Sequence, residues 1–221
     1  GRSVGGVAAA GIAGAPTVDA ATLEVRTAST RATSSNATFE LGRSLGLLDV
    51  DAAIYDPAQC PGGAGLCALL EQAAITIADR AGTPQIQLVT VPGEVFPELY
   101  LGVATRRRTD CPAADTGRPA EPSIRDAMTA PFKLVVGLSP DELGYVVPGY
   151  DFYPASVFDE QKDPCDGQEY DAQHPRRRVP THYHEVLSLG IETASYVTCT
   201  AVELLQGSAA IEDEPACRAL H

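Results

Sequence analysis

Six cysteines constrain the fold of this 221-residue chain more than any other feature. No two of them form the C-x-x-C pair that zinc ribbons and redox motifs need. Most lie in segments rich in Pro, Gly and Asp, which is typical of loops stapled by disulfides in an oxidising compartment. We therefore expect an extracytoplasmic protein that is secreted, periplasmic or held at the cell surface. The cysteines are Cys60, Cys67, Cys111, Cys165, Cys199 and Cys217.

The disulfide connectivity stays open, because six cysteines allow fifteen pairings. Cys60 and Cys67 flank a short Gly-rich loop, and this is the pair that we expect first. Cys111 with Cys165 and Cys199 with Cys217 would complete the set.

Composition predicts a globular chain with long loops. Hydrophobic residues make up 44% of the sequence and charged residues 20%, and no apolar run approaches the roughly 18 residues of a transmembrane helix. Gly (20 residues) and Pro (17 residues) are abundant, so loops must carry much of the chain. The net charge of −13 would repel a phosphate backbone, and no nucleic-acid partner is expected.

The start of the chain predicts proteolytic processing. The first residue is Gly1 and the only methionine is Met128, so we expect a piece of a longer precursor. The opening segment has small residues but lacks the apolar density of a secretory signal. We divide the chain into residues 1–35, a Gly/Ala/Ser-rich segment predicted to form loops after a processing site, and residues 36–221, the folded domain.

Short apolar segments predict alternating helices and strands. Leu66–Arg80 carries a helical stripe, although its second half fits a strand equally well. Ile191–Gln206 has the pattern of a core-packed amphipathic helix, with Gly207 as its C-cap. A further helix is expected to begin at Phe96.

Four segments have the character of strands. A β-rich run from Pro84 to Val89 stops at a Pro-Gly pair, and Phe132–Leu138 is the clearest candidate for a buried strand. Thr38–Leu41 and Leu143–Val147 are shorter candidates. The alternation favours an α/β, mixed α+β, architecture: a mixed sheet with flanking helices and long disulfide-stapled loops.

No self-sufficient catalytic motif is present. His184-Glu185 begins like the metalloprotease H-E-x-x-H, but the second histidine is missing. The sequence has no nucleophile elbow and no P-loop. It has four histidines, and none precedes His174, so a metal site built by this chain alone is not expected.

Three segments resemble the neutral/alkaline non-lysosomal ceramidase family. Val91–Glu94 (VPGE), followed by FPEL, resembles the PGE segment of that family. Gly137–Tyr145 (GLSPDELGY) is similar to the G-L-x-N-D-E-x-G-Y stretch of its bacterial members. Tyr183–Gly190 (YHEVLSLG) resembles the Y-G-E-x-x-S-L-G segment, which a helix follows. The segments keep the family's order over roughly residues 38–206, so the resemblance implies the C-terminal half of a larger catalytic domain.

The resemblance implies a zinc-dependent amide hydrolase. In the family, two histidines from the first half of the domain, the glutamate of PGE and the tyrosine that closes the second segment hold one zinc ion. The last two fall on Glu94 and Tyr145. A zinc-bound water, with a pKa lowered toward about 7, would attack an N-acyl amide of a lipid-like, sphingolipid-type substrate. Tyr183 and His184 would polarise the carbonyl or move a proton.

The departures from the family define the expected partner. The histidine-bearing half is absent, so both histidine ligands must come from another chain, expected to be the N-terminal chain of the same precursor. His184 replaces a residue that is usually Gly or Tyr, and residues 149–182 exceed the family's spacing, so a different amide substrate is an open alternative. The second alternative is a catalytically inactive ceramidase-like protein that serves as a disulfide-stabilised surface or assembly component.

Without the resemblance, ordinary structural roles would account for these residues. Glu94 would be a solvated or capping carboxylate, and Tyr145 a half-buried aromatic residue with a bonded hydroxyl. His182 and His184 are expected to be ordinary hydrogen-bonded histidines rather than a second metal pair. Arg106–Arg108 and Arg176–Arg178 are expected in solvated or protease-sensitive loops, with contact to an anionic membrane surface as the alternative.

Overall fold

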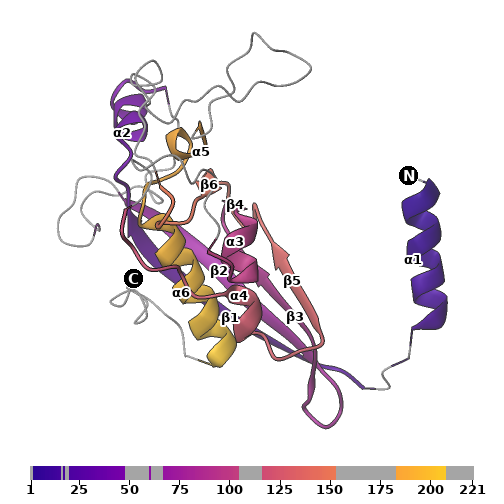
Figure 1. The fold of residues 1–221 in the computed structure, drawn as a ribbon. Coiled ribbons are helices and arrows are strands. Elements are labelled where there is room, and N and C mark those ends of the chain that lie inside the picture. Colours follow the sequence, from indigo (N-terminus) through magenta and orange to yellow (C-terminus); the bar gives the residue numbers. More distant parts are fainter. Residues whose placement is uncertain are drawn as a thin grey trace.

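A four-stranded mixed sheet lies at the centre of the fold (Figure 1). The structure, a computed structural model, describes residues 2–15, 17, 20–47, 60, 67–104, 116–152 and 183–207. The strand order is β1-β2-β3-β5, in which β1–β2 and β2–β3 are antiparallel and β3–β5 is parallel. The predicted mixed α+β class is confirmed. The strands are β1 (Thr22–Thr33), β2 (Cys67–Ala78), β3 (Pro84–Thr90) and β5 (Phe132–Val136).

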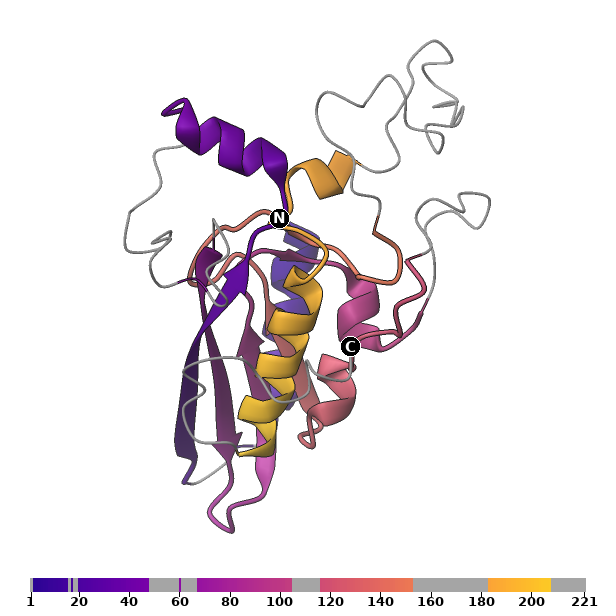
Figure 2. The same ribbon diagram turned by 90° about the vertical axis from the view of Figure 1, so that its left-hand side faces the viewer.

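Helices cover one face of this sheet. α6 packs on β1 and β2 and also contacts α4, which in turn contacts α3; Figure 2 shows α6 lying along the sheet. A second, two-stranded parallel sheet, β4–β6, lies at one end of the molecule near α5. The remaining elements are α1 (Arg2–Gly14), α2 (Ala37–Ser44), β4 (Glu94–Val95), α3 (Pro97–Leu101), α4 (Ile124–Ala127), β6 (Tyr145–Val146), α5 (Tyr183–Val186) and α6 (Thr193–Gln206).

Small residues let α6 approach the sheet closely. The strand positions beneath the helix are the buried residues Ala28, Ala32, Ala68 and Ala74. Leu70 and Tyr196 fill the space between the layers, and both are fully buried. Gly207 ends α6 in the left-handed conformation at φ 93°, which confirms the predicted C-cap.

The helix predicted over Leu66–Arg80 is wrong, because Cys67–Ala78 forms β2. Leu70 and Ala74 lie under α6, whereas Ile75 and Ile77 alternate with them on the opposite face. Because both faces of the segment carry apolar residues, its sequence fits the periodicity of an amphipathic helix as well as that of a strand. The strand alternative, which the sequence allowed for its second half, holds for the whole segment.

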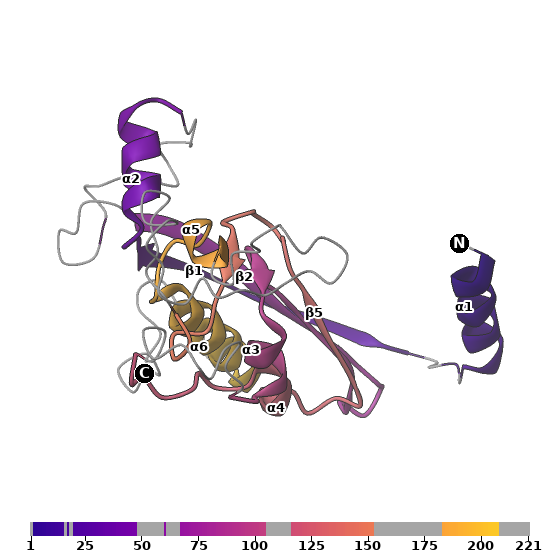
Figure 3. The same cartoon turned by 45° about the horizontal axis from the view of Figure 1, so that its top comes forward.

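The first 35 residues are also more regular than predicted. They form α1 and β1 rather than loops. The inward positions of β1 are Ala28, Thr30 and Ala32, and such small residues give no hydrophobic alternation to detect. Figure 3 shows α1 standing apart from the sheet, and none of its residues is buried.

Two strand predictions also need correction. Thr38–Leu41 lies in the helix α2, where Asn36 Oδ1 accepts a hydrogen bond from Thr38 N at 2.9 Å. Phe132–Leu138 does contain the strand β5, but that strand lies at the sheet edge rather than in the core, and Phe132 is 66% exposed. The strand from Pro84 is confirmed as β3, and the helix expected at Phe96 begins at Pro97.

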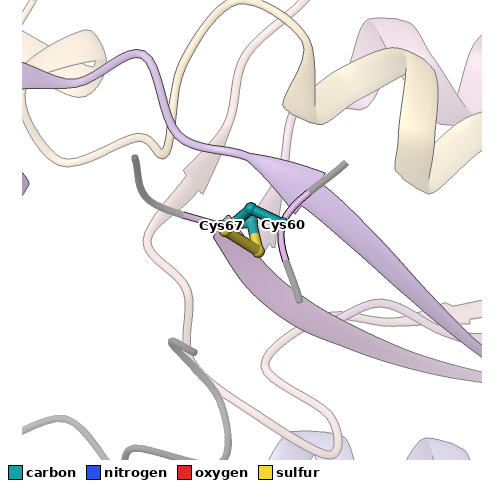
Figure 4. The surroundings of a disulfide bond; sticks show 2 residues. All are labelled: Cys60 and Cys67. Atoms are coloured by element: carbon teal, nitrogen blue, oxygen red, sulfur yellow. A yellow bond between two sulfur atoms is a disulfide. The ribbon is translucent and has the colours of Figure 1, made fainter. Parts of the chain in front are cut away.

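The predicted Cys60–Cys67 disulfide is confirmed (Figure 4). The two Cα atoms are 5.4 Å apart, and the bond fixes Cys60 to the first residue of β2. Cys199 is also disulfide-bonded, and its partner lies outside the described residues. The other predicted pairings involve Cys111, Cys165 and Cys217, which lie there too. None of the described helices is long and apolar enough to cross a membrane.

Candidate metal centre

The segments Val91–Glu94, Gly137–Tyr145 and Tyr183–Gly190 meet beyond one end of the main sheet. Glu94 N donates a hydrogen bond to Gly144 O at 2.9 Å, which joins the first segment to the second. Tyr145 N donates to Leu187 O at 3.1 Å, which joins the second segment to the third. Segments that are dozens of residues apart in the sequence therefore form one unit through their backbones.

Two glycines make this close approach possible. A Cβ atom on Gly93 would lie 2.5 Å from Gly144 O, inside the contact distance of any real side chain. Gly144 has φ +80°, and its Cβ would lie 1.7 Å from Leu187 O. Only glycine combines that backbone conformation with that lack of space. The glycines of the P-G-E and L-G-Y triplets are therefore required by the fold of the site.

Glu94 and Tyr145, the two predicted zinc ligands, are direct lateral partners. They pair in the register of the parallel strands β4 and β6. Paired residues on adjacent strands are separated by about 4.8 Å and project to the same face of the sheet. Glu94 is exposed and Tyr145 is partly buried, so the pair lies at an accessible surface.

His184 belongs to the same cluster. Its ring contacts the Tyr145 ring edge-to-face, with centroids 4.6 Å apart, and the Phe96 ring at 5.0 Å. Phe96 follows Glu94 by two residues in extended chain, so both lie on the same face. Sequence reasoning missed the role of Phe96, although this spacing could have indicated it. Tyr183 is the first residue of α5, and its side chain lies outside the described parts of the structure.

The third segment is anchored by residues that sequence reasoning did not assign to the site. Asn36 Nδ2 donates to Ser188 O at 2.6 Å and to Glu185 O at 3.3 Å, and Ser34 Oγ donates to Leu189 O at 2.9 Å. The Asn36 side chain is almost fully buried. The Asn36 side chain therefore serves as an internal anchor for the third segment.

A buried carboxyl lies close to the chain that leaves β6. Gly149 N donates to Glu121 Oε1 at 2.7 Å. Burial raises the pKa of Glu121 above its ordinary value of 4.5, and this effect outweighs the opposing hydrogen bond from Gly149. Arg118 forms an ion pair with Glu192, the N-cap residue of α6. These contacts link the chain that follows β6 to the start of α6.

Glu94 and Tyr145 offer two oxygen groups, a carboxylate and a phenol. A carboxylate is a donor that zinc accepts beside imidazole nitrogens. Over the described ranges, no group of three or more His, Cys, Asp or Glu side chains could hold a metal ion. The histidines at 174, 182 and 221 and both arginine triplets lie outside those ranges. Glu94 and Tyr145 thus share one face of the β4–β6 sheet, and by themselves they do not make a metal site.

The chain matches no protein-family model, no curated protein and no solved structure. The functional argument therefore depends on the residues and geometry of the site itself.

Proposed function

We propose that this chain is a subunit of an extracytoplasmic zinc-dependent amide hydrolase of the neutral ceramidase type. The observation that carries the proposal is the lateral pairing of Glu94 with Tyr145. The resemblance implies that both residues are metal ligands, and the two segments that bear them are far apart along the chain. Their pairing at an accessible surface supports a shared role. The Cys60–Cys67 disulfide supports the extracytoplasmic location.

The proposed catalytic roles are those that the resemblance implies for these residues. The Glu94 carboxylate and the Tyr145 hydroxyl would bind the zinc ion, together with two histidines from the N-terminal chain of the precursor. A bound zinc ion would supply a water with a pKa lowered toward about 7 and would polarise the amide carbonyl. His184 packs on the Tyr145 ring, where an imidazole can hold or move a proton during amide cleavage. Tyr183, which precedes it in α5, is proposed as the group that hydrogen-bonds the carbonyl oxygen.

Two exposed leucines support an N-acyl, lipid-like substrate. Leu138 is 47% exposed, and its N–H donates to Gly93 O, next to Glu94. Leu187 is 50% exposed, and its carbonyl accepts from Tyr145 N. Exposed apolar residues whose backbones bond next to a polar centre suit a substrate with a polar amide and a hydrocarbon chain.

Hydrolysis of a fluorescent N-acyl amide by the natively purified assembly tests this proposal. We expect Glu94→Gln and Tyr145→Phe each to reduce kcat by about 100-fold or more, because each removes a ligand of the ion that polarises the carbonyl. Glu24→Gln, which changes an exposed carboxylate on β1, is the matched control and should keep full activity. Full activity in Glu94→Gln would contradict the proposal. Absence of both zinc and hydrolysis in the native assembly would favour the inactive assembly component.

A further inference from the structure

The face of the sheet opposite α6 carries a band of large apolar side chains that runs across all four strands. The strand registers place these side chains in two lateral rows, each with one residue from every strand. Both ends of the band are open to solvent, because Leu23 is 67% exposed and Phe132 is 66% exposed. The rows are Leu23, Ile77, Ile86 and Phe132, and Val25, Ile75, Leu88 and Leu134. We call these eight residues the apolar band.

The apolar band is short along the strands and wide across them. On one side it stops where β1 begins, at Thr22, and where β3 begins, at Pro84. On the other side, Thr27 and Thr90 are the next residues of the same face and bring hydroxyl groups. Four strands spaced by about 4.8 Å are roughly 14 Å across, and the two rows are about 7 Å apart. With its side chains, the band therefore measures about 20 Å by about 10 Å.

The helix α1 has these dimensions and needs a surface to pack on. Its 13 residues make a rod about 20 Å long and about 10 Å wide. It carries no charged residue after Arg2, and none of its residues is buried. Gly5, Gly6 and Gly11 each lower its stability as a helix, and isolated helices of this length are marginal in water even when they are rich in Ala. Packing on an apolar surface would provide the stability that this sequence lacks alone.

One side of α1 carries its large side chains at a spacing that fits the sheet. Val4, Val7 and Ile12 are 74%, 75% and 78% exposed. Ala8 and Gly11 complete the i, i+3, i+4, i+7, i+8 pattern of a packing face. Val4 and Ile12 are about 12 Å apart along the helix axis, close to the roughly 14 Å that separate β1 from β5. A helix that lies across the strands can therefore place Ile12 over β1 and Val4 near β5.

The connection between α1 and the sheet favours a contact within the same chain. Residues 15–21 join Gly14 to Thr22, and these seven residues can span at most about 23 Å. Leu23, which follows Thr22 directly, is already part of the apolar band. A packed helix axis lies about 10 Å from its neighbour, so the connection is long enough. A tethered segment also has an effective concentration in the millimolar range at its own chain, which favours its own sheet over that of a second copy.

We propose that α1 closes over the apolar band of its own chain, with Ile12 at the β1 end and Val4 at the β5 end. The closed helix is the third layer of an α/β/α sandwich. It covers the parallel β3–β5 pair on its second face, as is usual for parallel strands. In the structure α1 stands apart from the sheet (Figure 3), which is the open arrangement. The argument uses exposure, register and dimensions, and it does not depend on the proposed function.

Photo-cross-linking of the natively purified full chain tests the contact. Benzoylphenylalanine replaces Val4 in α1 or, as the matched control, Leu45, which is 62% exposed and follows α2. We expect the probe at Val4 to link to the β5 peptide around Leu134, with a yield about tenfold or more above that from Leu45. A mixture of isotope-labelled and unlabelled chains separates links within a chain from links between chains. Links between chains, or a yield from Val4 no higher than that from Leu45, would overturn the proposal.

Hydrogen exchange of the backbone amides tests the same contact without a cross-linker. The amides of α1 should exchange about tenfold or more slowly than those of an unstructured peptide, because packing holds the helix. Leu134→Asp puts a charge under the closed helix and should remove this protection, whereas Leu45→Asp should leave it unchanged.

The amides of α6 show whether each variant keeps its fold, and the cross-link from Val4 requires no substitution in the sheet. Exchange of α1 at the peptide rate in the unsubstituted protein would contradict the closed helix. Protection of α1 that survives Leu134→Asp would contradict its contact with the apolar band.

Discussion

The helix–sheet body and the site end of this molecule are stabilised in different ways. In the body, formed by β1, β2 and α6, buried side chains such as Leu70 and Tyr196 fill the space between two layers. At the site end, formed by β4, β6 and α5, backbone hydrogen bonds join short segments, and glycines allow the approach. Stability in the body therefore depends mainly on side-chain volume. The site end also buries side chains such as Val146 in the same core, but it has a strict requirement for backbone conformation in addition.

The largest expected effect is a cavity in the body. Leu70→Ala should lower the free energy of unfolding by about 3 kcal/mol, because it removes a fully buried side chain from between the layers. Leu134→Ala, at an exposed position of the same sheet, should cost less than about 1 kcal/mol in the isolated chain. Urea denaturation of both variants checks this difference. Equal losses would mean that the two faces of the sheet are equally packed.

A backbone change should affect the site end specifically. Gly144→Ala places a Cβ against Leu187 O in a left-handed conformation, and we expect a loss of about 2 kcal/mol or more. Gly82→Ala is the matched control, because Gly82 has nearly the same φ, +82°, with nothing within 4 Å of the added Cβ. It should cost about 1 kcal/mol from conformation alone. Thermal unfolding of both variants measures these losses. Equal losses of stability in the two variants would show that Gly144 is not packed against Leu187 and that β6 and α5 are not closely joined.

The smallest expected effect concerns the polar link between the two regions. The pKa of Glu121 is raised above 4.5 in the fold. Between pH 4.5 and the raised pKa, the folded state therefore binds more protons than the unfolded state. The free energy of unfolding should therefore fall as pH rises through that window. Glu121→Gln should remove this component and flatten the profile, since its amide oxygen can still accept from Gly149 N. An unchanged pH profile of stability would contradict the assignment of the titration to Glu121.

Local backbone requirements are easier to read from the sequence at the site end than in the body. Gly93 and Gly144 carry such a requirement, and the segments that bear Glu94, Tyr145 and His184 do lie together. The strands of the body carry few signals of this kind. The strand β2 is apolar on both faces, and helical and strand periodicities cannot be told apart there.

The body predictions that held depended on local signals. Gly207 ends α6, and a Pro-Gly pair follows β3. Residues that stop a helix or a strand therefore predicted the ends of these elements correctly. The inward side of β1 uses small residues because α6 lies close above it, and this requirement comes from the partner element rather than from the strand itself. The same limit applies to Asn36, whose anchoring role depends on Ser188, more than 150 residues away.

Zinc analysis of the natively purified assembly, with intact-mass identification of every chain in it, tests the central claim most directly. The account predicts one zinc per assembly, a second chain that supplies histidines, and loss of the zinc in Glu94→Ala while the stability of the fold is kept. Metal-free native material without a second chain would contradict the split hydrolase. The pairing of Glu94 with Tyr145 would then belong to a protein that uses this fold for assembly.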